Sequence, residues 1–194
     1  MTWKEHVKVI ASKIAKNLGI LRKISYLLPS KILINLYYTL VNPYFLYGNI
    51  VWASTYYTCT KCLILLQKRA IRIIARDKYY DHTSKRFQEL DIMKFDCINR
   101  YLTGNFLFKY FNNLLPPVFT NFFTKTIDVH EHYTRAVSGL TVQYARTNYR
   151  RFSLYCKGPI IWNDIPANIR AVKSFPQFKS LWKAYIKSGD DQLG

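Results

Sequence analysis

The residues best suited to chemistry in this sequence are the basic side chains of the stretch 63–76, LILLQKRAIRIIAR. Three of them recur at the spacing i, i+4, i+8, which places like charges in one row along a helix. Such a row repels itself unless an anion lies along it. The spacing alone favours a solvated basic face, and the alternative interpretation is a helix whose cations face phosphate groups. The cations of this stretch are Lys68, Arg69, Arg72 and Arg76.

An apolar stripe in the same stretch would hold these cations in fixed register. Apolar residues recur there at helical spacing, and they predict one helix over 61–76 with a buried face and a cationic back. We expect the buried face to consist of Leu63, Leu66, Ala70, Ile73 and Ile74.

The overall charge points to a polyanionic partner. The 194 residues include 29 Lys and Arg against 11 Asp and Glu, a net charge of +18, and residues 1–76 contain a single acid, Glu5. A field of this sign attracts nucleic acid or an anionic membrane surface. The charge alone leaves both classes of partner open. Further expected contacts are Lys13, Lys16, Arg22 and Lys23, and a second basic patch lies at Arg146, Arg150 and Arg151.

The acidic residues do not form a recognisable catalytic set. A two-metal polymerase or nuclease needs converging carboxylates to hold its ions, and no pair among the eleven has a spacing that suggests one. The triplet His130-Glu131-His132 alternates its side chains and lacks a third ligand. Neither a glycine-rich phosphate loop nor a nucleophile elbow is present. The sequence therefore argues against autonomous catalysis.

The four cysteines predict neither a disulfide framework nor a metal site. Cys59 and Cys62 form a CxxC pair, but the downstream candidates, His82 and Cys97, follow at gaps too long for a zinc knuckle. We expect no metal and no cofactor. Cysteines without the density of a secreted scaffold predict a reducing, intracellular compartment.

The stretch 32–60 carries no formal charge over 29 residues, which is long enough to cross a bilayer. Its asparagines, Pro43 and six tyrosines argue against a span, because lipid cannot satisfy their polar groups. We expect this stretch to be largely buried inside a helical unit. The alternative is a membrane-associated or protein-docking helical module built on 32–60.

The pattern as a whole predicts a mainly α fold. The first expected helix covers 3–26 and is capped by Thr2 with Glu5. Ser30 caps the second, which Pro43 kinks or ends. Further helices are expected over 84–90, over 93–113 and after Ser174. That last helix should bury Phe175, Phe178, Leu181, Trp182 and Tyr185. Residues 124–156 read as irregular with a short hairpin near 141–145, and Gly158-Pro159 should start a compact region. The expected domains are a three-helix unit over 1–80, a helical and irregular region over 81–188 and a frayed tail over 189–194.

Six blocks in a fixed order carry a family resemblance. They are TWKEHVKVIASKIAKNLGILRKISYLLP, LYYTLVNPYFLYGNIVWAS, LLQKRAIRII, YYDHTSKRFQELDIMKFD, GPIIWNDIPANIR and SFPQFKSLWKAYI. Together they resemble the C-terminal part of reverse transcriptases encoded by jockey-type non-long-terminal-repeat retrotransposons, over nearly the whole chain.

This resemblance implies a thumb-like unit that grips template and primer, followed by the post-thumb region. The family's catalytic aspartates, including the pair of its Tyr-x-Asp-Asp motif, lie upstream of the matching blocks. The chain would thus be a non-catalytic fragment of an RNA-directed DNA polymerase, a truncated element copy or a partial gene. The resemblance places Lys68, Arg69, Arg72 and Arg76 in the family's basic block, which implies contact with nucleic acid. It implies sequence-tolerant binding to RNA, DNA or a hybrid duplex, and we expect no small-molecule substrate.

Overall fold

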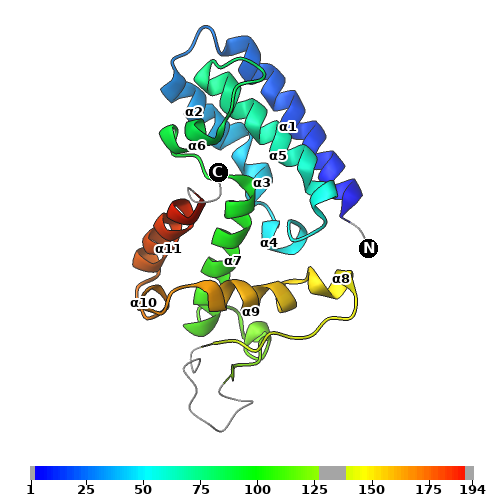
Figure 1. Ribbon diagram of the computed structural model, residues 1–194, viewed down its shortest axis with the longest axis vertical. Coiled ribbons are helices and arrows are strands. Elements are labelled where there is room, and N and C mark those ends of the chain that lie inside the picture. The colour runs from blue at the N-terminus through cyan, green and yellow to red at the C-terminus, as the bar shows by residue number, and fades with distance from the viewer. Residues whose placement is uncertain (1–2, 127–138, 191–194) are drawn as a thin grey trace. The chain divides into compact units, whose positions relative to one another are not determined.

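The computed structural model describes residues 3–126 and 139–190. These residues form helices and connecting segments, with one isolated antiparallel bridge between Lys125 and Leu140 (Figure 1). The mainly α fold predicted from the apolar periodicity is confirmed. None of the helices in the described ranges combines the length and the hydropathy needed to cross a bilayer.

The chain forms two compact units, which divide between Ile98 and Asn99 rather than at the expected position after residue 80. The segment beyond residue 80 belongs to the first unit because its side chains and backbone bond back to α5 and the loop after it. The helices of the first unit are α1 (Lys4–Ile24), α2 (Ser30–Leu40), α3 (Asn42–Leu46), α4 (Asn49–Trp52), α5 (Tyr57–Ala75) and α6 (Ser84–Glu89).

The core of the first unit is built mainly on α1 and α5, which lie side by side (Figure 1). On α1 the expected apolar stripe is buried, with Ile14, Leu18 and Leu21 at its centre. On α5 the buried residues are Thr60, Leu63, Gln67, Ala70, Ile71 and Ile74. The expected members Leu66 and Ile73 are only half-buried, because α5 contacts α2 as well as α1 and its buried face is turned toward Ile71.

The uncharged stretch 32–60 covers most of α2, the short helices α3 and α4, and the first turn of α5. Pro43 ends the second helix as expected: α2 stops at Leu40, and Pro43 lies in the first turn of α3, where a missing N–H costs little. The expectation that this stretch is largely buried is wrong for α2, whose only buried side chains are Leu33 and Tyr37, because α2 packs on its neighbours with one face.

Two of the expected helix caps can be compared with the structure, and Thr2 lies outside the described residues. Ser30 is the first residue of α2 and makes no capping bond; its hydroxyl instead donates to the carbonyl of Ile74 at 3.2 Å. This bond ties the start of α2 to the end of α5. The last helix begins directly after Ser174, as expected.

Gln67 is the polar centre of the first unit and is 1% exposed. Its Nε2 donates to the Tyr37 hydroxyl at 3.0 Å and to the Met93 carbonyl at 2.9 Å, and its Oε1 accepts from the Phe95 backbone N–H at 2.9 Å. Burial raises the pKa of Tyr37. Because each of these polar groups would lack a partner without Gln67, the network holds α5, α2 and the segment before α7 together.

The second unit begins at Asn99, within α7. Its elements are α7 (Phe95–Phe111), η1 (Pro117–Phe119), α8 (Asn148–Arg151), α9 (Leu154–Asp164), α10 (Ala167–Arg170) and α11 (Phe175–Asp190). Aromatic rings fill its core, for example Phe108 stacked on Phe178 at 4.3 Å and Phe111 on Trp162 at 4.5 Å between ring centroids.

Several expectations for the second unit are wrong. Residues 141–145 contain no strand; Leu140 instead exchanges two hydrogen bonds with the Asn163 side chain. Gly158-Pro159 lies inside α9, where a Cβ on Gly158 would be 3.1 Å from the Phe123 ring. The last helix continues to Asp190, into the expected tail. Leu181 and Tyr185 are 41% and 38% exposed, because α11 buries only the narrower stripe of Phe178, Trp182 and Ile186.

Candidate nucleic-acid interface

A cleft of about 330 Å³ lies in the first unit, at the C-terminal ends of α1 and α5. Four of its lining residues are arginines, and only one is acidic. We call it the arginine cleft; it is lined by Arg22, Ser25, Tyr26, Arg69, Arg72, Ile73, Arg76, Asp77 and Tyr79.

The packing of α1 on α5 positions these arginines. Arg22 lies in the last turn of α1 and Arg72 in the last turn of α5, where cations interact favourably with the partial negative charge of the helix end. Arg69 is three residues before Arg72 and therefore on the same side of α5. The half-buried Ile73 supplies apolar surface between them.

Arg76 is not part of the helical row that its spacing predicted. The helix ends at Ala75, and Arg76 adopts the left-handed conformation with φ 59° as its C-cap. Its Nη2 donates to the carbonyls of Ser25 at 3.3 Å and Leu28 at 3.0 Å. Arg76 therefore ties the end of α5 to the turn after α1 and has a structural role as well as a place in the cleft.

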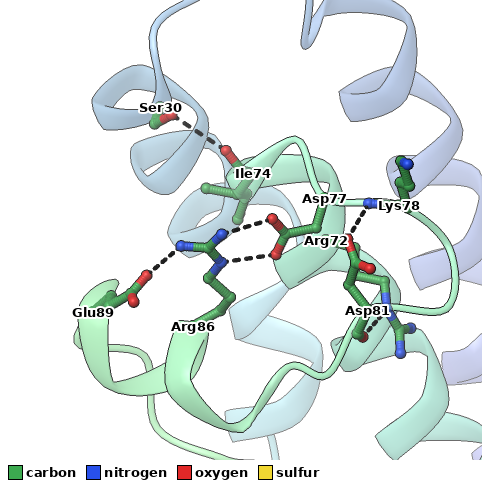
Figure 2. Close-up of polar contacts among 8 residues, drawn as sticks. All are labelled: Ser30, Arg72, Ile74, Asp77, Lys78, Asp81, Arg86 and Glu89. Carbon is green, nitrogen blue, oxygen red and sulfur yellow. Dashed lines mark hydrogen bonds and ion pairs between the residues drawn. The ribbon is translucent and has the colours of Figure 1, made fainter.

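Arg72 holds the loop that follows α5. Its Nε donates to the Asp81 carbonyl at 3.0 Å, as Figure 2 shows, and its guanidinium lies 6.0 Å from the centre of the Tyr79 ring. The Asp81 carboxylate in turn accepts from the Lys78 backbone N–H at 2.7 Å. Arg72 thus fixes the loop that brings Tyr79 to the cleft.

The single carboxylate of the cleft, that of Asp77, is neutralised from outside it. Arg86 on α6 donates to both Asp77 oxygens at 2.9 Å and to Glu89 at 2.6 Å (Figure 2). Hydrogen bonds to Asp77, and after it to Glu89, raise the pKa of Arg86. The Asp77 side chain is only 9% exposed, so its oxygens are largely shielded from direct contact with an anion in the cleft. The field in the cleft is therefore positive.

Donor groups remain available in the cleft. Within the described part of the chain, no hydrogen bond or ion pair engages the guanidiniums of Arg22 and Arg69, and both residues are exposed. A guanidinium carries five N–H donors in a planar fork that matches two phosphate oxygens. Arg22 and Arg69 can therefore bind an oxyanion without breaking an internal contact.

Sequence reasoning missed the two tyrosines of the cleft. Tyr26 is 76% exposed and Tyr79 is 71% exposed. Aromatic rings at this level of exposure beside arginines are typical of surfaces on which nucleic-acid bases stack. Only their position next to helix ends in the sequence could have singled them out, since periodicity gives no signal outside a helix.

The remaining expected contacts do not line the arginine cleft. Lys68 is exposed on α5 but does not line the cleft, and three exposed lysines, Lys13, Lys16 and Lys23, lie on α1 outside the cleft. Arg146, Arg150 and Arg151 belong to the second unit, where the Arg150 guanidinium lies 5.9 Å from the centre of the Tyr155 ring.

No three metal-binding side chains come together in residues 3–126 and 139–190. No disulfide bond joins the four cysteines, all of which lie in the described ranges: Cys59, Cys62, Cys97 and Cys156. His82 lies in the loop before α6. The triplet His130-Glu131-His132 lies outside the described residues.

Comparison of the chain with protein-family models, with curated proteins and with solved structures found no match.

Proposed function

We propose that this chain binds nucleic acid through its phosphate groups, without reading the base sequence, as the non-catalytic thumb and post-thumb part of a retrotransposon reverse transcriptase. One observation carries the proposal of binding: four arginines gather in one cleft whose only carboxylate is already paired with Arg86. The identity as a retrotransposon fragment rests on the six sequence blocks alone.

The chemistry of the arginine cleft favours phosphate over other anions. Arginine forks form two parallel hydrogen bonds to phosphate, and several forks together follow a backbone that carries a charge at each nucleotide. The exposed Lys13, Lys16, Lys23 and Lys68 extend the positive field beyond the cleft. Contacts of this kind position a protein on nucleic acid but do not distinguish sequences.

A salt titration tests this proposal. Arg22→Gln with Arg69→Gln should weaken binding to labelled duplexes of unrelated sequence alike, in a fluorescence anisotropy assay. The slope of log affinity against log salt should flatten by about 1 per lost phosphate contact, or about 2 for the double variant. The matched control is Lys173→Gln with Lys179→Gln, which removes the same charge from exposed positions of the second unit. A double cleft variant with the wild-type slope would refute binding through this cleft.

The proposal also holds that the chain does not polymerise nucleotides. Its support is the small number of carboxylates and their spacing in the sequence. Primer extension with magnesium and purified protein is the test, and incorporation above that of boiled protein would contradict the non-catalytic assignment.

A second candidate is a docking module for protein or membrane built on 32–60. The observation in its favour is that Tyr47 and Val51, within this stretch, are 81% and 55% exposed. Flotation of the protein with uncharged lipid vesicles separates the two candidates, because an arginine cleft has no affinity for an uncharged surface. If the wild type floats with these vesicles and the double variant Tyr47→Ser with Val51→Ser does not, the result would favour the docking module.

A further inference from the structure

We infer that the arginine cleft holds one unpaired nucleotide of a nucleic-acid strand, with the base against the exposed rings of Tyr26 and Tyr79 and the phosphate on the guanidiniums. The protein would then prefer a duplex with a single-stranded end to a blunt duplex. This inference rests on the proposed function and goes beyond it, since phosphate contacts alone make no such distinction.

The size of the cleft supports a single unpaired nucleotide. Its volume of about 330 Å³ falls at the lower end of the range for small-molecule sites, roughly 300–1,000 Å³. The two bases of a pair are held in the helical stack, so neither is free to enter the cleft. A base that lacks a partner enters without the cost of unpairing.

The lining of the cleft offers both surfaces that a nucleotide needs. Tyr26 and Tyr79 present flat rings, and Ile73 adds apolar surface beside them. The Tyr79 ring is held by two neighbours, the Arg72 guanidinium at 6.0 Å and the edge-on Tyr80 ring at 5.0 Å. A ring that is already positioned loses little freedom when a base stacks on it.

The guanidinium donors of the arginines lie beside these rings rather than along a groove. Arg22 and Arg69 have uncommitted guanidiniums, while Arg72 and Arg76 are tied to the carbonyls of Asp81, Ser25 and Leu28. The two uncommitted groups therefore supply the phosphate contacts, and the two tied groups supply fixed positive charge. Stacking surface with adjacent arginines is the combination that proteins use for unpaired strands.

The test compares one hairpin duplex in three forms: blunt, with a short single-stranded overhang, and with an overhang of abasic residues. The overhang should tighten binding about tenfold, which is within the range for stacking of a single base. The abasic overhang keeps the phosphates but removes the bases, so it should lose the gain. A 2-aminopurine in the overhang should be quenched on binding because it stacks on a tyrosine.

Tyr26→Leu with Tyr79→Leu should abolish the gain and the quenching, because leucine keeps apolar bulk but has no aromatic face. The gain is measured in each protein as the ratio of its affinities for the overhang hairpin and the blunt hairpin. Tyr47→Leu, at an exposed ring outside the cleft, is the matched control and should keep the gain. A gain that survives in the abasic overhang or in the double leucine variant would overturn the inference.

The outcomes separate this inference from the proposed function. Equal binding to all three hairpins, weakened by Arg22→Gln with Arg69→Gln, would refute the unpaired-nucleotide site and leave phosphate binding standing. Absence of binding to any hairpin would refute both. A free nucleoside monophosphate shares the same chemistry, so adenosine monophosphate is added as competitor. If adenosine monophosphate displaces the overhang hairpin at a concentration equal to that of the hairpin, the cleft is a site for free nucleotides and the inference is overturned.

Discussion

Arg86 donates two parallel hydrogen bonds of 2.9 Å to the carboxylate of Asp77. This pair offsets the one negative charge in the lining of the arginine cleft, because Asp77 is the only acid there. The helix α6 contributes no residue to the cleft, but through Arg86 it affects the charge of the cleft.

We expect Arg86→Gln to weaken nucleic-acid binding although Arg86 does not line the cleft. The change leaves the Asp77 carboxylate without its partner, and its charge then repels phosphate. Adding Asp77→Asn should restore the affinity, and Asp77→Asn alone should not lower it. Anisotropy titrations of the three variants measure these effects. A loss of affinity that Asp77→Asn does not restore would mean that Arg86 itself contacts the nucleic acid.

Arg76→Gln should lower the free energy of unfolding by about 1 kcal/mol, because the variant loses hydrogen bonds that an exposed charged group makes. The reason is that Arg76 joins the end of α5 to the carbonyls of Ser25 and Leu28. Urea denaturation measures the change. Lys68→Gln removes an equal charge from an exposed position of the same helix and should leave the stability as it is. Equal urea midpoints for the two variants would contradict the structural role of Arg76.

Gly104→Ala should destabilise the second unit by about 1–3 kcal/mol, the usual cost of overpacking a core. A Cβ at this position would lie 2.8 Å from Cε2 of the Trp182 ring, which is itself fully buried. Gly19→Ala is the control, because no atom lies within 4 Å of the added Cβ on α1. That variant should be more stable than the wild type by up to about 1 kcal/mol. Thermal unfolding of both variants decides, and a tolerated Gly104→Ala would contradict the close packing.

Stability should fall in alkaline solution through Tyr37. Burial raises the pKa of Tyr37 in the folded state above its ordinary value of 10.0, so the unfolded chain releases the proton first. The contribution to stability is complete below about pH 10 and is lost above it, by about 1.4 kcal/mol per pH unit. Tyr37→Phe should show a shallower alkaline decline in urea denaturation. Parallel pH profiles for the two proteins would show that Tyr37 does not titrate on unfolding.

The sequence by itself determined the helical class and the main amphipathic helices. The apolar period of α1 and α5 predicted two helices that share a core, because burying an apolar stripe requires a partner. Pro43 predicted the end of α2, since it removes a backbone donor. These features depend on neighbours along the chain, so local sequence specifies them.

Only the tertiary structure decided which cations act together. The spacing of Lys68, Arg72 and Arg76 predicted one row on one helix, but Arg76 lies beyond the helix end and Lys68 does not line the cleft. The cleft instead takes Arg22 from α1, because the C-terminal ends of α1 and α5 meet. Tyr26 and Tyr79 enter it from loops, whose course depends on bonds to residues distant in sequence. Periodicity carries no information about such bonds, which is why the cleft could not be predicted from the sequence.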